Sequence, residues 1–81
     1  MSVPATPRLS IIVPVLNEAH GIADALSALA EARRAGHEVI VVDGGSRDGS
    51  PELAGPLADR VIASPRGRAK QMNAGAAAAG G

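Results

Sequence analysis

The sequence has no cysteine and no aromatic residue, and its charge is balanced. Without cysteine, neither a disulfide nor a thiolate metal site can stabilise the fold, and a reducing compartment is compatible with this composition. Without aromatic side chains, the chain has no platform on which the bases of a single-stranded nucleic acid could stack. Eight basic residues match eight acidic ones, which argues against a general nucleic-acid or membrane-surface binder.

Long apolar runs and a secretory signal are also absent. No apolar stretch approaches the roughly 18 residues that a membrane span requires. Residues 1–8 contain two prolines and lack the apolar core of a signal peptide, so we interpret them as a disordered lead-in. A chain of 81 residues has room for one small domain, which we place at 9–81.

Two β-branched runs stand out in what the sequence does contain, and each stops abruptly at polar residues. The first, at 9–13, ends at Pro14, and the second, at 38–42, ends at Asp43. Apolar runs without alternation are typical of strands buried on both faces of a parallel sheet. Since open α/β sheets bind ligands outside the carboxyl ends of their strands, we expect function in the loops that follow.

The segment between these two runs predicts a helix. Asn17 is a favourable N-cap residue, and apolar side chains recur at helical spacing from there to about Arg34. Gly36 predicts the end of this helix, because glycine commonly closes helices in a left-handed conformation.

The second half of the chain repeats this alternation. Ser50 predicts the cap of a short helix at 51–58, which Pro56 should shorten or kink. A strand at 60–63 and an alanine-rich helix at 69–79 follow. The whole pattern predicts an α/β fold of three βα units with a parallel sheet and right-handed crossovers.

The loop after the first strand, at 14–18, matches neither standard phosphate-binding loop. It lacks the glycines of the dinucleotide fingerprint and the Gly-Lys-Ser/Thr of a P-loop. Asp43 has the position at which a dinucleotide-binding fold places the acid that binds ribose hydroxyls. It is therefore a candidate acceptor of hydrogen bonds from a base or a ribose.

Three segments taken in order, 14–18, 41–50 and 66–75, resemble the N-terminal half of family 2 glycosyltransferases, which have the GT-A fold. The resemblance covers about residues 8–80, and the three segments together at these spacings are strongly specific. Val-Asp-Gly-Gly-Ser and Arg-Gly-Arg-Ala-Lys-Gln-Met-Asn-Ala-Gly look most like a bacterial subgroup, the radical-SAM-associated or arsenosugar-biosynthesis glycosyltransferases. The implied fold is the Rossmann-like N-terminal half of a GT-A domain, so the chain resembles a fragment of a larger domain.

The resemblance also implies a nucleotide site. Asp43 would accept a hydrogen bond from the base, Ser46 would shape its loop, and Gly67 would let the backbone approach the nucleotide. Arg66 and Arg68 would approach the diphosphate, which suits guanidinium geometry. The other residues that the resemblance assigns to the nucleotide are Pro14, Leu16, Asn17, Glu18 and Asn73. Some members carry an aromatic residue where Leu16 stands, so the preferred base stays open.

The implied function is that of the nucleotide-diphospho-sugar-binding half of a glycosyltransferase that transfers a sugar to an acceptor hydroxyl with inversion. The resemblance implies Mg²⁺ or Mn²⁺ in the full-length enzyme, but it places the metal motif and the catalytic base after the last predicted helix. The chain alone is therefore expected to bind no metal and to be inactive. The expected partners are a nucleotide-sugar donor and an unknown acceptor, and the expected location is cytoplasmic, with membrane association of a full-length protein left open.

Two other functions remain open. One is a non-catalytic α/β module that binds a nucleotide or another protein. The other is a sugar-nucleotidyltransferase, although such an enzyme would carry a glycine-rich loop with a basic residue after the first strand. Local structure also offers simpler interpretations: Asn17 and Glu18 as a helix cap, Asp43 as a turn residue, and the arginines at 66 and 68 as a solvated patch.

Overall fold

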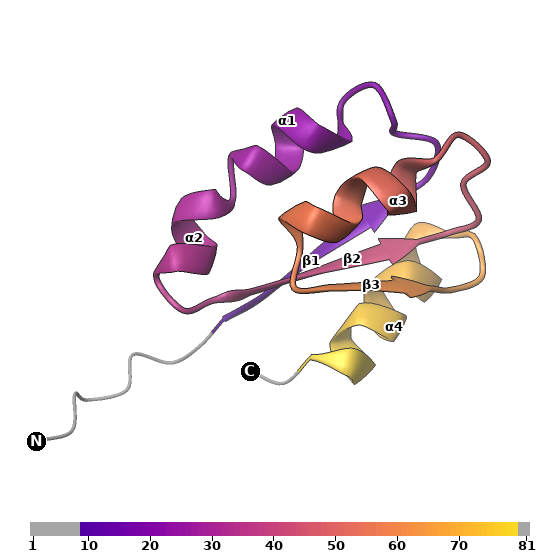
Figure 1. The fold of residues 1–81 in the computed structure, drawn as a ribbon. Coiled ribbons are helices and arrows are strands. Elements are labelled where there is room, and N and C mark those ends of the chain that lie inside the picture. Colours follow the sequence, from indigo (N-terminus) through magenta and orange to yellow (C-terminus); the bar gives the residue numbers. More distant parts are fainter. Residues whose placement is uncertain (1–8, 80–81) are drawn as a thin grey trace, which may run out of the picture.

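The computed structural model of the chain describes residues 9–79. The lead-in predicted at 1–8 lies outside the described residues. In chain order the elements are β1 (Ser10–Val15), α1 (Ile22–Ser27), α2 (Ala30–Arg34), β2 (Glu38–Asp43), α3 (Ser50–Ala54), the 3₁₀ helix η1 (Gly55–Leu57), β3 (Arg60–Ala63) and α4 (Arg68–Ala78) (Figure 1).

The described residues form a three-stranded parallel sheet in the order β1-β2-β3. Ser10 lies opposite Glu38 in the first pair, and Ile40 lies opposite Arg60 in the second. Every residue of the central strand β2 is buried, as its unbroken apolar run predicts. The predicted α/β fold with a parallel sheet is confirmed.

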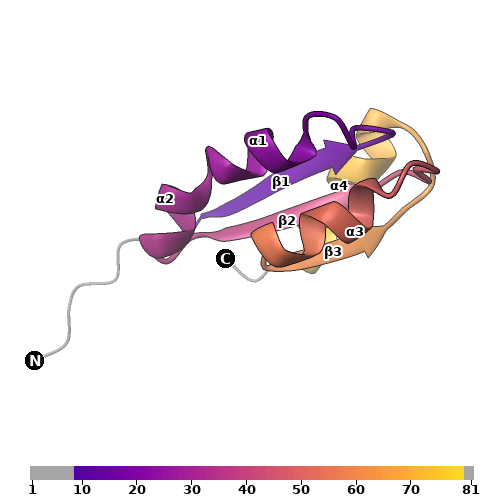
Figure 2. The ribbon, with the colours of Figure 1, turned by 45° about the horizontal axis from the view of Figure 1, so that its top comes forward.

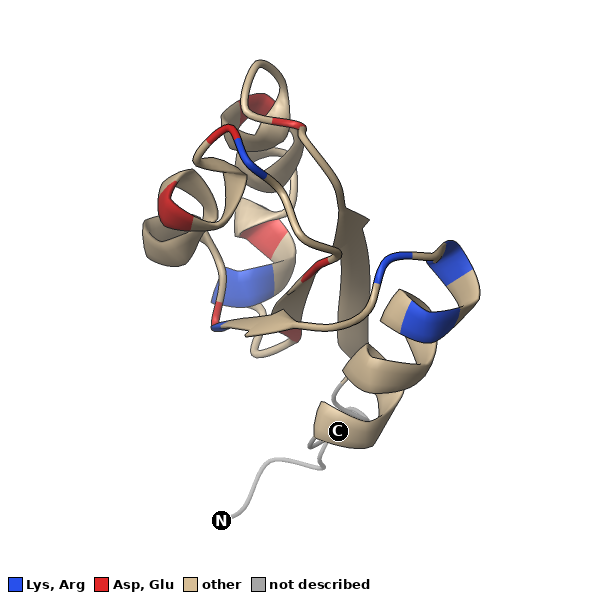
Figure 3. Cartoon of the chain, turned by 90° about the vertical axis from the view of Figure 1, so that its right-hand side faces the viewer, with Lys and Arg blue, Asp and Glu red and all other residues tan. Residues whose placement is uncertain are grey.

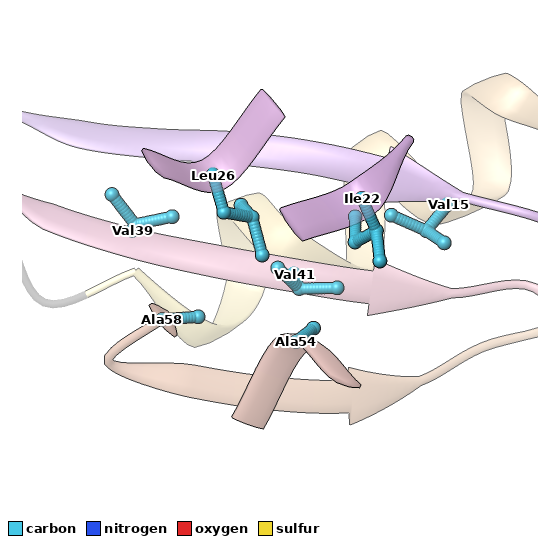
Figure 4. Close-up of a cluster of buried hydrophobic side chains, with 7 residues drawn as sticks. All are labelled: Val15, Ile22, Leu26, Val39, Val41, Ala54 and Ala58. Carbon is cyan, nitrogen blue, oxygen red and sulfur yellow. The ribbon is translucent and has the colours of Figure 1, made fainter. Parts of the chain in front are cut away.

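The helices cover the two faces of the sheet unequally. Helices α1, α2 and α3 lie on one face and α4 lies on the other, as the two views of the ribbon show (Figure 2). Buried apolar side chains fill the space between the sheet and the helices α1 and α3 (Figure 4). They are Val15, Ile22, Leu26, Val39, Val41, Ala54 and Ala58. Because side chains alternate along a strand, the neighbouring residues Ile40 and Val42 of β2 face α4 instead.

The predicted end of the first strand at Pro14 is wrong. Strand β1 continues to Val15, and Pro14 pairs with Val42 inside it. Among the described strands β1 has a single neighbour, and a proline without an N–H group is tolerated in a strand that is hydrogen-bonded along one side.

The predicted helix from Asn17 to Arg34 is wrong at its start and in its continuity. It begins only at Ile22, with Gly21 in the N-cap position, and it divides into α1 and α2. At the division the N–H of Leu29 donates to the carbonyl oxygen of Leu26, one residue closer than in an α-helix, and Leu29 packs against the core. The predicted closure at Gly36 is confirmed by its left-handed φ of 98°.

The second half of the chain follows its prediction closely. Strand β3 has the predicted bounds, and α4 differs from the predicted 69–79 by one residue at each end. Helix α3 begins at Ser50, so the N-cap position belongs to Gly49 and not to Ser50. Pro56 shortens this helix as expected, and the chain continues through it as a 3₁₀ turn. Within residues 9–79 no helix has the length and apolar character that crossing a lipid bilayer requires.

Candidate functional site

The loops that follow the carboxyl ends of the described strands lie together at one end of the sheet, which faces the viewer in Figure 3. They are the β1–α1 loop at 16–21, the β2–α3 loop at 44–49 and the β3–α4 loop at 64–67. Parallel strands place these loops side by side, and this is the edge at which α/β sheets bind ligands. Eight of the ten predicted site residues lie in these loops or directly at their borders, Pro14 lies one residue before the end of β1, and Asn73 lies within α4.

The first two loops are joined by a set of hydrogen bonds that we call the loop clasp. Three successive backbone N–H groups of the first loop donate to side chains of the β2–α3 loop and of the first residue of α3. The pairs are Asn17 to Ser46 Oγ at 2.8 Å, Glu18 to Ser50 Oγ at 2.8 Å, and Ala19 to Asp48 Oδ2 at 3.0 Å. In return, Asn17 Oδ1 accepts from the N–H of Arg47 at 2.9 Å. These amides are occupied, so they do not form a cradle for phosphate.

The backbone of Asn17 explains why the helix does not start there. Its φ is 52°, a left-handed conformation that asparagine tolerates better than most residues. The predicted capping role of Asn17 is therefore wrong. Its side chain satisfies an amide of the partner loop, whereas the carbonyl oxygen of Glu18 accepts from the N–H groups of Gly21 and Ile22 at the start of α1.

Asp43 is 7% exposed, and its two carboxylate oxygens have different environments. Oδ2 accepts from the N–H groups of Gly45 at 3.0 Å and Ser46 at 2.9 Å, which fixes the carboxylate in a turn. Oδ1 is buried and has no hydrogen-bond partner within residues 9–79. A buried acceptor without a donor is unfavourable, so this oxygen is suited to a donor group of a ligand.

Gln71 is a site residue that the sequence analysis missed. It lies in α4, is 4% exposed, and its amide nitrogen donates to the carbonyl oxygens of Val15 at 3.0 Å and Val42 at 2.9 Å. Its Oε1 accepts from the N–H of Gly67 at 3.3 Å. One side chain thus connects the ends of β1 and β2 to the β3–α4 loop. The sequence signal that could have identified it is its spacing from Gly75. Four residues separate the two, so they share one face of the helix, and a glycine on that face indicates close packing.

A hollow of about 170 Å³ lies beside Gln71 at this edge of the sheet, and Asp43 is not among its lining residues. Its lining residues are Pro14, Val15, Leu16, Glu18, Arg68 and Gln71. This volume is below the roughly 300–1,000 Å³ of typical small-molecule pockets, so the hollow suits part of a nucleotide. A larger hollow of about 360 Å³ lies near the start of β3, where Arg33 pairs with Asp59 at 3.4 Å, and its lining includes none of the predicted site residues.

The remaining predicted residues lie at different distances from the hollow. Gly67 has a φ of 132° and precedes α4, and Arg66 is exposed beside it. Asn73 is exposed in α4, about 200° around the helix from the buried Gln71. The structure does not bring Asn73 to the hollow, and its role stays a prediction.

Charge is distributed unevenly around this edge. Figure 3 shows basic residues on the β3–α4 loop and the first turn of α4, whereas the β1–α1 loop is acidic and the β2–α3 loop carries both signs. The hydroxyl of Ser50, together with the backbone amide of Ala19, holds the pKa of Asp48 below its usual value. Within the described part of the chain, no three histidine, cysteine or carboxylate side chains lie close enough together to hold a metal ion.

Comparison with known proteins identifies the family. Glycosyltransferase AglE of Haloferax volcanii is 44% identical over 50 residues, which are 59% of this chain and 16% of that protein. The relative is archaeal, so it gives no support to the bacterial subgroup, and the matched part spans less than a fifth of its length. No solved structure matches the chain. Residues 10–81 match the family model for glycosyl transferase family 2, so the chain belongs to this family and carries the Rossmann-like N-terminal part of its fold.

Proposed function

We propose that the chain binds the nucleoside diphosphate of a nucleotide-sugar donor at the loops described above. The observation that carries this proposal is the buried Oδ1 of Asp43, which has no partner within residues 9–79. Asp43 lies opposite Val15 in the sheet, and Val15 lines the hollow. An incoming N–H or O–H group of a base or ribose would supply the missing donor.

The clasp and the arginines together suggest where the diphosphate binds. The amides of residues 17–19 already have partners in the β2–α3 loop and at the first residue of α3, so they are not available to phosphate oxygens. Arg68 lines the other side of the hollow, with Arg66 exposed beside it. Guanidinium groups bind phosphate oxygens in a bidentate manner, so these side chains supply the positive charge that the backbone does not.

For the whole protein we propose transfer of the sugar to an acceptor hydroxyl with inversion. The bond between the sugar and the diphosphate breaks as the acceptor oxygen attacks from the opposite face. This needs a base for the hydroxyl proton and charge stabilisation for the leaving diphosphate. Arg66 and Arg68 would stabilise part of that charge. A divalent metal commonly supplies the rest, but the described residues hold no cluster that fits one, so no step here depends on it.

The test is nucleotide binding by isothermal titration calorimetry and thermal melting with UDP and GDP. Asp43→Asn keeps one oxygen for the amides of Gly45 and Ser46 but can place an NH₂ group where the acceptor stood. We expect at least one of the two nucleotides to bind wild type, and binding to weaken about 10- to 100-fold in the variant, as for loss of a charged hydrogen bond of ~1.5–3 kcal/mol.

The matched control is Asp24→Asn, which removes an exposed carboxylate in the first turn of α1. It should bind as wild type does. The proposal fails if millimolar UDP and GDP both leave the melting midpoint of wild type unchanged. It also fails if Asp43→Asn binds as tightly as wild type.

A further inference from the structure

We infer that Asp48 is a positioning residue of the nucleotide site, an inference that rests on the function proposed above. Asp48 is exposed and does not line the hollow. Its carboxylate nevertheless links the loop that follows Asp43 to the loop that forms a wall of the hollow. We therefore expect it to control nucleotide affinity without touching the nucleotide.

The carboxylate of Asp48 accepts hydrogen bonds from the β1–α1 loop and from the first residue of α3. Oδ2 accepts from the N–H of Ala19 at 3.0 Å. Oδ1 accepts from the N–H of Ser50 at 3.1 Å and from the hydroxyl of Ser50 at 2.5 Å. Because the hydroxyl gives its proton to Asp48, its oxygen presents a lone pair to the N–H of Glu18, which lies 2.8 Å away. Asp48 therefore holds the amide of Ala19 directly and that of Glu18 through Ser50, which is 0% exposed.

These bonds hold the backbone of the β1–α1 loop, which forms one wall of the hollow. Leu16 and Glu18 line it, and Asn17 between them has the left-handed backbone that few residues adopt without support. On the other side, Ser46 donates its N–H to Asp43 Oδ2 and accepts the N–H of Asn17 at its hydroxyl. The clasp thus connects the wall of the hollow with the carboxylate proposed to bind the base or ribose.

A purely local role for Asp48 makes a different prediction. Aspartate often bonds the backbone N–H two residues later to form a turn, and Asp48 does this with Ser50. Asparagine forms the same turn, so Asp48→Asn leaves a local role intact. The NH₂ group, however, would face either the N–H of Ala19 or the N–H of Ser50, and a backbone N–H can only donate, so one of these hydrogen bonds is lost.

The first measurement is amide hydrogen exchange by NMR on the ligand-free chain. In Asp48→Asn we expect the amides of Glu18 and Ala19 to exchange about tenfold faster or more, because opening of the clasp exposes them to solvent. The amides of Val39 and Val41 in the buried strand should be unchanged, which shows that the fold is intact. Asp24→Asn should leave all four amides unchanged. Equal exchange at Glu18 and Ala19 in wild type and Asp48→Asn would overturn the inference.

The second measurement is the affinity for UDP and GDP of wild type, Asp48→Asn and Asp43→Asn, at a temperature at which all three are folded. If the open clasp leaves the binding-competent loop about one-tenth populated, the apparent Kd of Asp48→Asn rises about tenfold. A change of less than twofold while wild type binds would overturn the inference. If wild type binds neither nucleotide, the proposed function fails, and the inference, which rests on it, fails with it. Hydrogen exchange still decides separately whether the clasp exists.

Discussion

Gly75 of α4 lies directly against Ile12 of β1, so closely that a Cβ atom on the glycine would fall 2.4 Å from Ile12 Cγ2. A second methyl group, Val42 Cγ2, would be 3.1 Å away. β-Branched side chains on a strand have little rotamer freedom, so neither can move aside at low cost. The absence of a side chain at Gly75 is what lets α4 approach the sheet.

We expect Gly75→Ala to destabilise the fold, although alanine favours the helix by ~1 kcal/mol relative to glycine. Overpacking in a close-packed interior costs about 1–3 kcal/mol, and this clash is severe enough to exceed the gain in helix propensity. Urea denaturation measures the difference. Ala76→Gly is the control, because Ala76 is an exposed residue of the same helix, so it should cost no more than the ~1 kcal/mol of helix propensity. Equal stability of Gly75→Ala and wild type would contradict the packing described.

Substitution of Gln71 should separate its hydrogen bonds from its volume. Gln71→Leu removes the donors to the carbonyl oxygens of Val15 and Val42, and we expect a loss of about 1–3 kcal/mol in the free energy of unfolding. Gln71→Glu keeps the shape but turns a carboxylate towards two carbonyl oxygens, so at pH 7 it should cost more than leucine. Chemical denaturation of both variants tests this order. A glutamate variant more stable than the leucine variant would show that the donors are not important.

Removal of Arg68 should affect the phosphates more than the nucleoside. In Arg68→Ala we expect about three- to tenfold weaker binding of UDP, a modest effect because the side chain is exposed and screened by solvent. Uridine has no phosphate, and its affinity should change by less than about twofold. Arg34→Ala, in α2, removes an equal charge away from the hollow and serves as the control. If Arg68→Ala weakens the binding of UDP and of uridine by the same factor, Arg68 does not act on the phosphates and the prediction is wrong.

The hydrogen bonds of the loop clasp to Asp48 should persist at mildly acidic pH. The pKa of Asp48 is lowered in the folded chain, chiefly by the Ser50 hydroxyl. A lowered folded pKa means that the stabilisation is complete above the pKa of an unfolded aspartate, about 3.9, and is lost as the pH falls through the folded value. Protection of the Ala19 amide, corrected for intrinsic exchange rates, should therefore be the same at pH 7 and pH 5. Loss of protection between these two values would contradict the prediction.

The strands and their parallel arrangement were predictable from the apolar runs and their alternation with helical segments. Residues Val39–Val42 form a run without alternation, and a central parallel strand accommodates such a run by burying both faces. The position of Asp43 after that run then follows. Pro14 misled the prediction because the rule that proline ends a strand holds for strands hydrogen-bonded along both sides, and among residues 9–79 β1 is paired along one.

The loops were not predictable, because distant residues determine their conformation. Asn17 has the sequence features of an N-cap, yet its N–H bonds to Ser46, 29 residues away, and the N–H of Glu18 bonds to Ser50, 32 residues away. A prediction based on neighbouring residues in the sequence cannot identify these partners. Gln71 was missed for a similar reason, since an amide reaches the strand ends only where the helix lies as close as Gly75 allows.

The order of strands in the sheet is also their order of synthesis, because β1, β2 and β3 are spatial neighbours in the sequence in which they leave the ribosome. Each new strand pairs with the one made before it, so loop closure never has to span more than one helical connection. All donors and acceptors of the loop clasp lie at or before Ser50 in the sequence. The β1–α1 loop, which forms one wall of the hollow, and the β2–α3 loop bonded to it can therefore be in place before α4 exists, and Gln71 then joins carbonyl groups that are already aligned. Arg68 and Gln71 of α4, the last helix of the described residues, then supply the remaining lining of the hollow.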